Sequence, residues 1–200
     1  MSYFRRFSLF ILINVLFVAW AAAQQPPLEV LREINKDRIG LNTGGMAVLG
    51  GWAVSNLLIG SVGMAKTGGS VRYFHQMNAA WNTVNLAIAG FGYYGLKNQS
   101  LDLSLAETVN EFHTFEKILL FNAGLDVGYI ALGAYLWERG LRKESERLTG
   151  YGQSLILQGG FLFTFDLILY LMNRSQSERL MEILNSVQFT GSAMTLQITF

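Results

Sequence analysis

Residues 118–137 read ILLFNAGLDVGYIALGAYLW, a run of twenty residues in which Asp126 carries the one formal charge. A helix rises about 1.5 Å per residue, so twenty residues cover the roughly 30 Å hydrocarbon core of a bilayer. The stretch therefore predicts a transmembrane helix with a carboxyl group near its middle. Because a carboxylate at that depth costs about 2.5–3.5 kcal/mol on insertion scales, Asp126 should face protein or water rather than lipid.

The composition of the whole chain also indicates lipid as the solvent. Of its 200 residues, 51% are hydrophobic and 14% are charged, and this charged fraction is far below that of a typical soluble domain. The 21 glycines suit transmembrane helices, where small residues let backbones approach closely. A net charge of +1 gives no reason to expect nucleic acid as a partner, and the lack of cysteine excludes disulfides and thiolate metal sites.

The N-terminus has the pattern of a secretory signal peptide. Arg5 and Arg6 precede an apolar run at 7–20, and three alanines follow at 21–23. This pattern predicts cleavage near Ala23, and an uncleaved anchor helix is the alternative. In either case the chain from residue 28 onward begins on the outer side of the membrane.

Four apolar stretches predict an all-α membrane protein built as a four-transmembrane-helix bundle over residues 44–172. The predicted spans are residues 44–65, 73–95, 118–137 and 151–172. Short local similarities between the first and third spans, and between the second and fourth, suggest two tandem hairpins. Ser104 followed three residues later by Glu107 predicts a helix start with a capping box, and that helix should run on into the third span.

Two flanking segments should lie outside the membrane. Residues 24–43 have apolar positions near helical spacing and predict a short amphipathic helix at the outer interface, with a solvated linker as the alternative. The tail at 173–200 begins as a charged helix and ends in the alternating segment MTLQITF. Such an ending is typical of outer-membrane β-barrels, but the twenty-residue apolar runs elsewhere contradict a barrel.

The lysines and arginines predict which side each loop faces. The two loops expected inside hold six of the fifteen within a short length of chain: Lys66, Arg72, Arg139, Arg142, Lys143 and Arg147. Cytoplasmic loops carry such an excess. The sequence thus predicts a multi-pass protein of the bacterial inner membrane with both termini external.

Each predicted span carries an amide or a carboxylate near the middle of the membrane. The candidate site consists of Asn56, Asn85, Asn122, Asp126, Gln158 and Asp166, with His75, Gln76, Asn78 and Asn82 as secondary candidates. Intramembrane ionisable residues are by default candidates for function, so Asp126 and Asp166 could form a site for a proton, an ion or a small ligand. The alternative is that these groups hold the helices together by hydrogen bonds.

Motifs for catalysis, metals and cofactors are missing from the sequence. It contains no phosphate-binding loop, no zinc protease motif and no nucleophile elbow, so we expect no enzyme activity. His75 and His113 fall at opposite ends of the predicted bundle, so we expect no haem or metal shared between them. No cofactor is predicted.

Three blocks, VLGGWAVSN at 48–56, HQMNAAWN at 75–82 and QGGFLFTFD at 158–166, accompany the signal peptide. Together they resemble an uncharacterised family of small bacterial membrane proteins with four transmembrane helices and a cleavable signal peptide. The resemblance covers about residues 44–172. It implies a fold and a bacterial envelope setting, but no activity or substrate.

Two functions from different classes follow as hypotheses. The first is a structural or accessory component of an envelope complex, with the lipid bilayer and a second copy or another membrane protein as partners. The second is a small transporter or ligand-binding protein, coupled to protons or ions, that uses the intramembrane Asp and Asn residues. Four spans are few for a carrier, so the second hypothesis favours a dimer.

Overall fold

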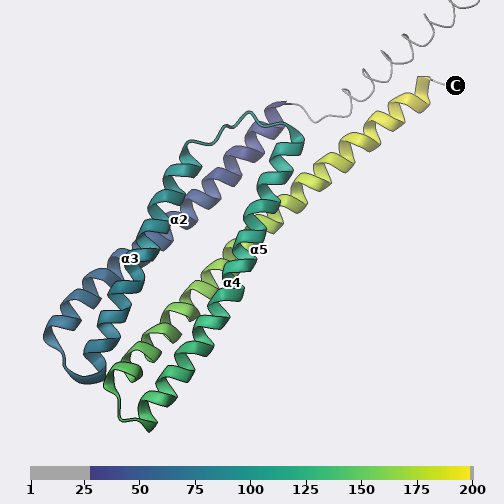
Figure 1. The fold of residues 1–200 in the computed structure, drawn as a ribbon. Helices are drawn as coiled ribbons and strands as arrows, with labels where there is room; N and C mark the ends of the chain where they lie inside the picture. Colours follow the sequence, from purple (N-terminus) through teal and green to yellow (C-terminus); the bar gives the residue numbers. More distant parts are fainter. Residues whose placement is uncertain (1–27, 199–200) are drawn as a thin grey trace, which may run out of the picture.

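The computed structural model describes residues 28–198, and their side chains as far as residue 183. This part of the chain is all helical, as predicted, and Figure 1 shows its four helices. They are α2 (Leu28–Lys66), α3 (Gly69–Lys97), α4 (Leu105–Arg142) and α5 (Glu146–Ile198). The predicted signal peptide at 1–23 lies outside the described residues.

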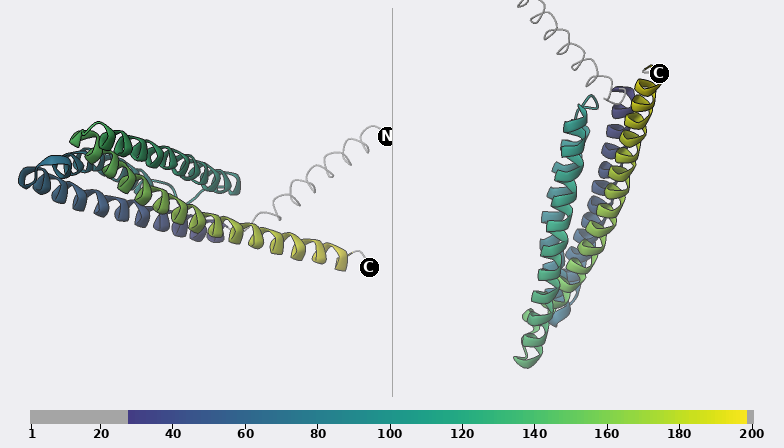
Figure 2. Two further views of the ribbon diagram at one scale, coloured as in Figure 1. Left: turned by 90° about the horizontal axis from the view of Figure 1, so that it is seen from below. Right: turned by 90° about the vertical axis from the view of Figure 1, so that its right-hand side faces the viewer.

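The helices form an elongated bundle in which the chain runs alternately up and down (Figures 1 and 2). The closest pairs are α2 with α3 and α4 with α5, so the chain forms two hairpins side by side. Helix α3 also packs along α5, whereas α2 touches α4 and α5 only slightly. The two short turns, at 67–68 and 143–145, lie at the same end of the molecule.

The distribution of polar and apolar side chains is the reverse of that in a soluble protein. Leu58, Phe91 and Phe121 are among the many large apolar side chains exposed on the outside. Asn82, Gln158 and several other polar side chains are buried. An apolar exterior around a polar interior is expected where lipid is the solvent, because polar groups cannot be satisfied by acyl chains.

Three of the described helices, α2, α4 and α5, are long and apolar enough to cross a membrane. The structure thus fits a multi-pass membrane protein. Helix α3 is not among the three, although it was predicted as the second span. Its amide side chains, with His75 and Arg72, lower its mean hydropathy, while its 29 residues exceed the length that a span requires.

The predicted flanking helices do not appear as separate elements among the described residues. Residues 28–43 are the first turns of α2, and residues 173–198 extend α5 beyond the bundle (Figure 1). No proline interrupts either helix, and the Gly44-Gly45 pair costs only about 1 kcal/mol per glycine in a helix. The segment at 194–198, which alternates in the sequence, is likewise helical.

The predicted capping box at the start of α4 is confirmed. The Glu107 backbone N–H donates to Ser104 Oγ at 3.3 Å, and the Ser104 backbone N–H donates to Glu107 Oε2 at 2.8 Å. The Ser104 hydroxyl also donates to Glu107 Oε2 at 2.7 Å, and this bond, followed by the bond from the Ser104 backbone N–H, lowers the pKa of the exposed Glu107 carboxyl group. The connection between α2 and α3 depends instead on Gly69, whose φ of +61° is readily adopted only by glycine.

Glycines bring α4 and α5 into close contact. A Cβ on Gly133 of α4 would lie 2.8 Å from the Gly152 carbonyl oxygen and 2.9 Å from the Ile156 backbone nitrogen of α5. No methyl group fits at these distances, so the backbones can approach this closely only with glycine at both positions. This contact positions the polar residues of α5 against those of α4.

Candidate functional site

The polar residues singled out in the four predicted spans gather inside the bundle. Asn122 is half-buried and the other five are buried. They come from all four helices: Asn56 from α2, Asn85 from α3, Asn122 and Asp126 from α4, and Gln158 and Asp166 from α5. They fall into two groups, one closed by hydrogen bonds and one lining a cavity.

The first group is an amide network that joins three helices. Asn78 Nδ2 of α3 donates to Asn56 Oδ1 of α2 at 2.9 Å. Gln158 Nε2 of α5 donates to Asn78 Oδ1, and Trp52 Nε1 of α2 donates to Gln158 Oε1 at 3.1 Å. Because each member finds a partner in another helix, this network acts as an interhelical link.

The network continues along α3 toward the second group. Asn82 Nδ2 donates to the Asn78 carbonyl oxygen at 2.8 Å, and Asn85 Nδ2 donates to Asn82 Oδ1 at 3.2 Å. Asn78 and Asn82, predicted only as secondary candidates, therefore lie between the two groups. Asn85 belongs to both, since it also lines the cavity.

The second group surrounds a cavity of about 240 Å³ at the middle of the bundle. Its polar wall consists of Asn85, Asn122, Asp126 and Asp166. The Asp126 and Asp166 carboxyl groups lie close enough to interact directly, and their side chains are 3% and 6% exposed. Asp126 Oδ2 is fully buried, and it has no hydrogen-bond partner among the described residues.

The charges around this cavity are not balanced by the protein. No lysine, arginine or histidine of the described residues lines it. Two adjacent carboxylates repel each other, and in a medium of low dielectric constant they need a proton or a cation between them. The oxygens of two carboxyl groups and two amides can supply the ligands or hydrogen-bond acceptors for such a species.

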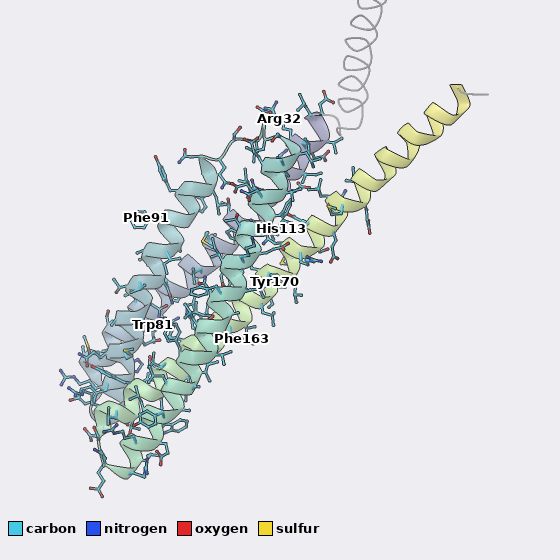
Figure 3. The ribbon with its side chains drawn as sticks, turned by 45° about the vertical axis from the view of Figure 1, so that its right-hand side comes forward. Arg32, Trp81, Phe91, His113, Phe163 and Tyr170 are labelled. Carbon is cyan, nitrogen blue, oxygen red and sulfur yellow. The ribbon has the colours of Figure 1, made fainter. Side chains whose placement is uncertain are left out.

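Aromatic rings form another part of the cavity wall. Trp81 of α3 and Tyr129 of α4 meet edge to face, with ring centroids 4.7 Å apart, and both line the cavity. Figure 3 places Trp81 in the half of the molecule where all four helices run together, with Arg32 and His113 toward the opposite end. The aromatic rings therefore belong to the part of the bundle that contains all four helices.

The other two secondary candidates lie apart from the cavity. The His75 ring packs against Gly63 of α2, and its buried Nδ1 finds no partner in the described part of the chain. Gln76 is near the turns, where its Oε1 accepts from the Tyr151 hydroxyl at 3.2 Å. The structure thus brings neither side chain to Asp126 and Asp166.

A buried arginine forms a second polar cluster near the other end of the bundle. Arg38 is 1% exposed, and it donates to Asn35 Oδ1, Gln99 Oε1 and Glu111 Oε2 at 3.1–3.4 Å. Burial lowers the pKa of Arg38, and the Glu111 carboxylate counteracts this effect. Arginine side chains are not deprotonated in proteins, so the guanidinium acts as a charged donor here.

Sequence reasoning missed this cluster. The 24–43 segment was interpreted as lying on the membrane surface, whereas Asn35, Arg38 and Asn42 point into a core shared with α4 and α5. Asn42 and Asn173 exchange hydrogen bonds of 3.1 and 2.8 Å between α2 and α5. The spacing of three and then four residues between Asn35, Arg38 and Asn42 was the available signal, because it places them on one helix face.

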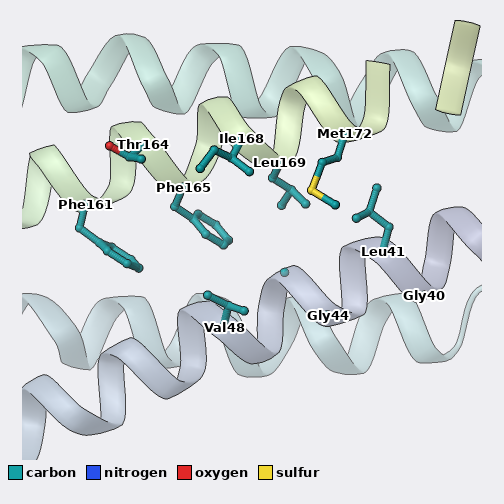
Figure 4. Close-up of a pocket in the computed structure, with 11 residues that line it drawn as sticks. Gly40, Leu41, Gly44, Val48, Phe161, Thr164, Phe165, Ile168, Leu169 and Met172 are labelled. Carbon is teal, nitrogen blue, oxygen red and sulfur yellow. The ribbon is translucent and has the colours of Figure 1, made fainter. Parts of the chain in front are cut away.

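An apolar groove lies between α2 and α5 and is shown in Figure 4. It has a volume of about 530 Å³, and Phe161, Phe165, Ile168 and Met172 line it opposite Val48. No charged side chain of the described residues lines it. Its carbon lining suits contact with acyl chains.

One comparison with known proteins gives a result. The model of a family of unknown function, DUF6992, matches residues 48–167. The chain belongs to DUF6992. This DUF6992 segment contains the amide network and the carboxyl pair, and it leaves out Arg38 and the extension of α5. No curated protein and no solved structure matches the chain.

Proposed function

We propose that this DUF6992 protein binds a positively charged species, a proton or a cation, between Asp126 and Asp166. The observation that carries the proposal is the buried Asp126 Oδ2, which has no partner and lies beside a second carboxyl group in a cavity. A buried carboxylate that keeps its charge needs compensation from a cation or from several hydrogen bonds. A bound proton or cation would supply that compensation.

The amide network supports the same proposal because its hydrogen bonding differs from that of the carboxyl pair. Asn56, Asn78 and Gln158 are bonded to one another, as expected of residues that hold helices together. The carboxyl pair has a cavity and an unbonded oxygen instead. A structural role accounts for the first group, whereas the cavity and the unbonded oxygen of the second group leave room for a bound species.

The proposed setting is the bacterial cell membrane, with four spans and both termini external. The common end of the two short turns and the basic residues beside them support this orientation. Helix α3 would be the remaining span, lying against α2 and α5. Reporter fusions after Gly68 and Lys143 should behave as cytoplasmic, and fusions after Asn98 and Ser175 as external. The opposite pattern would reject this topology.

Binding can be tested on the purified protein in lipid nanodiscs. We expect the wild type to take up protons, or to release or absorb heat when it is titrated with sodium or potassium ions. Asp126→Asn and Asp166→Asn should each abolish this signal. Asp102→Asn is the matched control, because Asp102 lies in the exposed loop beside Arg32 and should leave the signal unchanged. Folded Asp126→Asn protein with the signal of the wild type would contradict the proposal. Flux measured in vesicles would then separate a carrier from a binding protein.

A second candidate function is a non-enzymatic accessory role in an envelope complex or a homo-oligomer. Gly124 and Gly128 support it, because they lie four residues apart on the exposed face of α4 with no atom within 4 Å of an added Cβ. Such pairs allow close contact with another transmembrane helix. Cross-linking through cysteine at Phe121 should capture a partner chain, and Gly128→Leu should prevent it. A protein that stays a monomer at all concentrations would count against this role.

A further inference from the structure

Apart from its four polar residues, the lining of the carboxyl-pair cavity is hydrocarbon and aromatic. Leu49, Leu162 and Phe165 line it together with Trp81 and Tyr129. A bare inorganic ion is best bound by oxygen ligands on all sides. A site that combines two carboxyl groups and two amides with a largely apolar and aromatic lining is complementary to a molecule with one cationic end and an apolar body.

We propose that the ligand of this cavity is a small organic ammonium ion, a protonated amine with an apolar body, that reaches Asp126 and Asp166 from the bilayer. The inference rests on the proposed cation site and names its ligand class. The ammonium N–H groups would donate to Asp126 Oδ2 and to the Asp166 carboxylate. Such charge-assisted hydrogen bonds are about twice as strong as neutral ones.

The two aromatic rings favour an organic cation over a metal ion. Trp81 and Tyr129 meet edge to face with ring centroids 4.7 Å apart, and both line the cavity that Asp126 also lines. The ring faces attract an ammonium group within about 6 Å, and tryptophan does so most strongly. Carboxylates and ring faces together neutralise the charge and contact the carbon atoms next to the nitrogen.

The size of the cavity limits the ligand. Its 240 Å³ corresponds to about eight water molecules at roughly 30 Å³ each. A molecule of about eight non-hydrogen atoms, such as benzylammonium, is of this size. Larger amphipathic amines would extend through the mouth into lipid.

The mouth of the cavity opens between α3 and α4. Val84 and Ile88 of α3 and Leu125 of α4 all line the cavity, yet they are 57%, 53% and 42% exposed. These two helices have little direct contact with each other, since α3 packs mainly on α2 and α5. In a membrane this opening faces acyl chains, so an amine dissolved in the bilayer can enter sideways.

Calorimetric titration of the full-length protein in nanodiscs tests the ligand class, with benzylammonium as the probe. We expect the wild type to bind benzylammonium and not benzyl alcohol, which has the same shape without the charge. Asp126→Asn should abolish binding. Trp81→Leu should weaken it roughly tenfold, with Trp81→Phe recovering most of the affinity, and Trp137→Leu on exposed α4 surface should leave it unchanged.

The route of entry has its own test. Ile88→Trp should fill part of the mouth and slow the association of benzylammonium several-fold, whereas Phe91→Trp, on the outer face of the same helix, should not. Equal association rates for both variants would reject entry between α3 and α4.

The possible failures are distinguishable. If benzylammonium does not bind, while protons or sodium ions still bind in an Asp126-dependent manner, the proposal of an organic ligand is wrong and the proposal of a cation site stands. If benzyl alcohol binds as well as benzylammonium, the cavity recognises apolar bodies and the ammonium proposal is wrong. If no cation binds to the wild type, both proposals fail.

Discussion

Asn78 is the residue on which the amide network depends. Its side chain accepts from Gln158 of α5 and donates to Asn56 of α2, so one amide of α3 connects three helices. In water each such bond would contribute about 1 kcal/mol, and interhelical bonds in membranes average about 0.6 kcal/mol. Its removal would also leave the buried Asn56 Oδ1 and Gln158 Nε2 atoms without the partner that Asn78 supplies.

We expect Asn78→Leu to lower the free energy of unfolding by about 1–3 kcal/mol, because buried unsatisfied polar groups carry that cost. Unfolding in mixed micelles, followed by circular dichroism, measures the change. Thr83→Val on the same helix is the control, since exposed Thr83 bonds only to the Ala79 carbonyl oxygen of its own helix. A loss no larger than that of Thr83→Val would contradict the assigned role.

Arg38 gives a second prediction at the residue scale. Arg38→Met would keep most of the apolar stem but remove the donor to Asn35 Oδ1 and Gln99 Oε1, and Glu111 Oε2 would keep only the Gln99 amide as donor. Because Glu111 is partly exposed, we expect a loss of about 1–3 kcal/mol, below the range for a fully buried pair. Arg32→Met, at an exposed pair with Asp102, should change stability by less than about 0.5 kcal/mol. Similar losses in the two variants would disprove the buried cluster.

Glycine contacts set the distance between elements. Helices α4 and α5 meet at Gly133 and Gly152, and this contact lies on the same two helices that carry Asp126 and Asp166. A side chain at the contact would push the helices apart. The separation of the carboxyl groups therefore depends on these glycines.

We expect Gly133→Ala to destabilise the α4–α5 hairpin by about 1–3 kcal/mol, as overpacking of a close contact does. Gly124→Ala is the control on the same helix, because nothing lies within 4 Å of its added Cβ. That control should be neutral or stabilising by up to about 1 kcal/mol, since alanine is the better helix former. Thermal unfolding in detergent compares the two, and the reverse order would refute the close contact.

Local patterns in the sequence predicted the elements better than their ends. The Ser104 and Glu107 box was predictable because it involves residues three apart. The continuity of α2 through residues 28–66 was not predictable in this way. Its charged first part suggests the membrane surface and its apolar second part suggests the membrane interior, so the two parts look like separate helices. A helix continues wherever the backbone is not interrupted, whatever solvent surrounds it.

At the scale of the whole molecule, the bundle has two parts with different cores. Where α2, α4 and α5 meet near the start of α2, Leu31, Phe112 and Leu180 form an apolar core beside Arg38. The part that contains all four helices has the polar interior and the exposed apolar surface of a membrane domain. The matched family segment at 48–167 covers most of this second part and also includes Phe112 of the first part.

The sequence placed the polar groups in the bundle interior but could not separate their roles. Asn122 and Asp126, four residues apart, necessarily share a face of α4. Gln158 is bonded to Trp52 and Asn78, whereas Asp126 Oδ2 stays unbonded. This difference depends on how α3 and α5 pack. The burial of Arg38 also required the position of α5, which no local pattern encodes.

Chemical labelling in native membranes tests most directly whether Asp126 and Asp166 form a cation site open to the bilayer. A small uncharged carbodiimide, diisopropylcarbodiimide, dissolves in lipid and modifies protonated carboxyl groups, and mass spectrometry of peptides locates the product. We predict that the carbodiimide modifies Asp126 or Asp166 and that benzylammonium suppresses this modification. If the ligand is inorganic, sodium ions should suppress it instead. Modification only at exposed carboxylates such as Asp102, or labelling of the pair that no cation alters, would contradict the account.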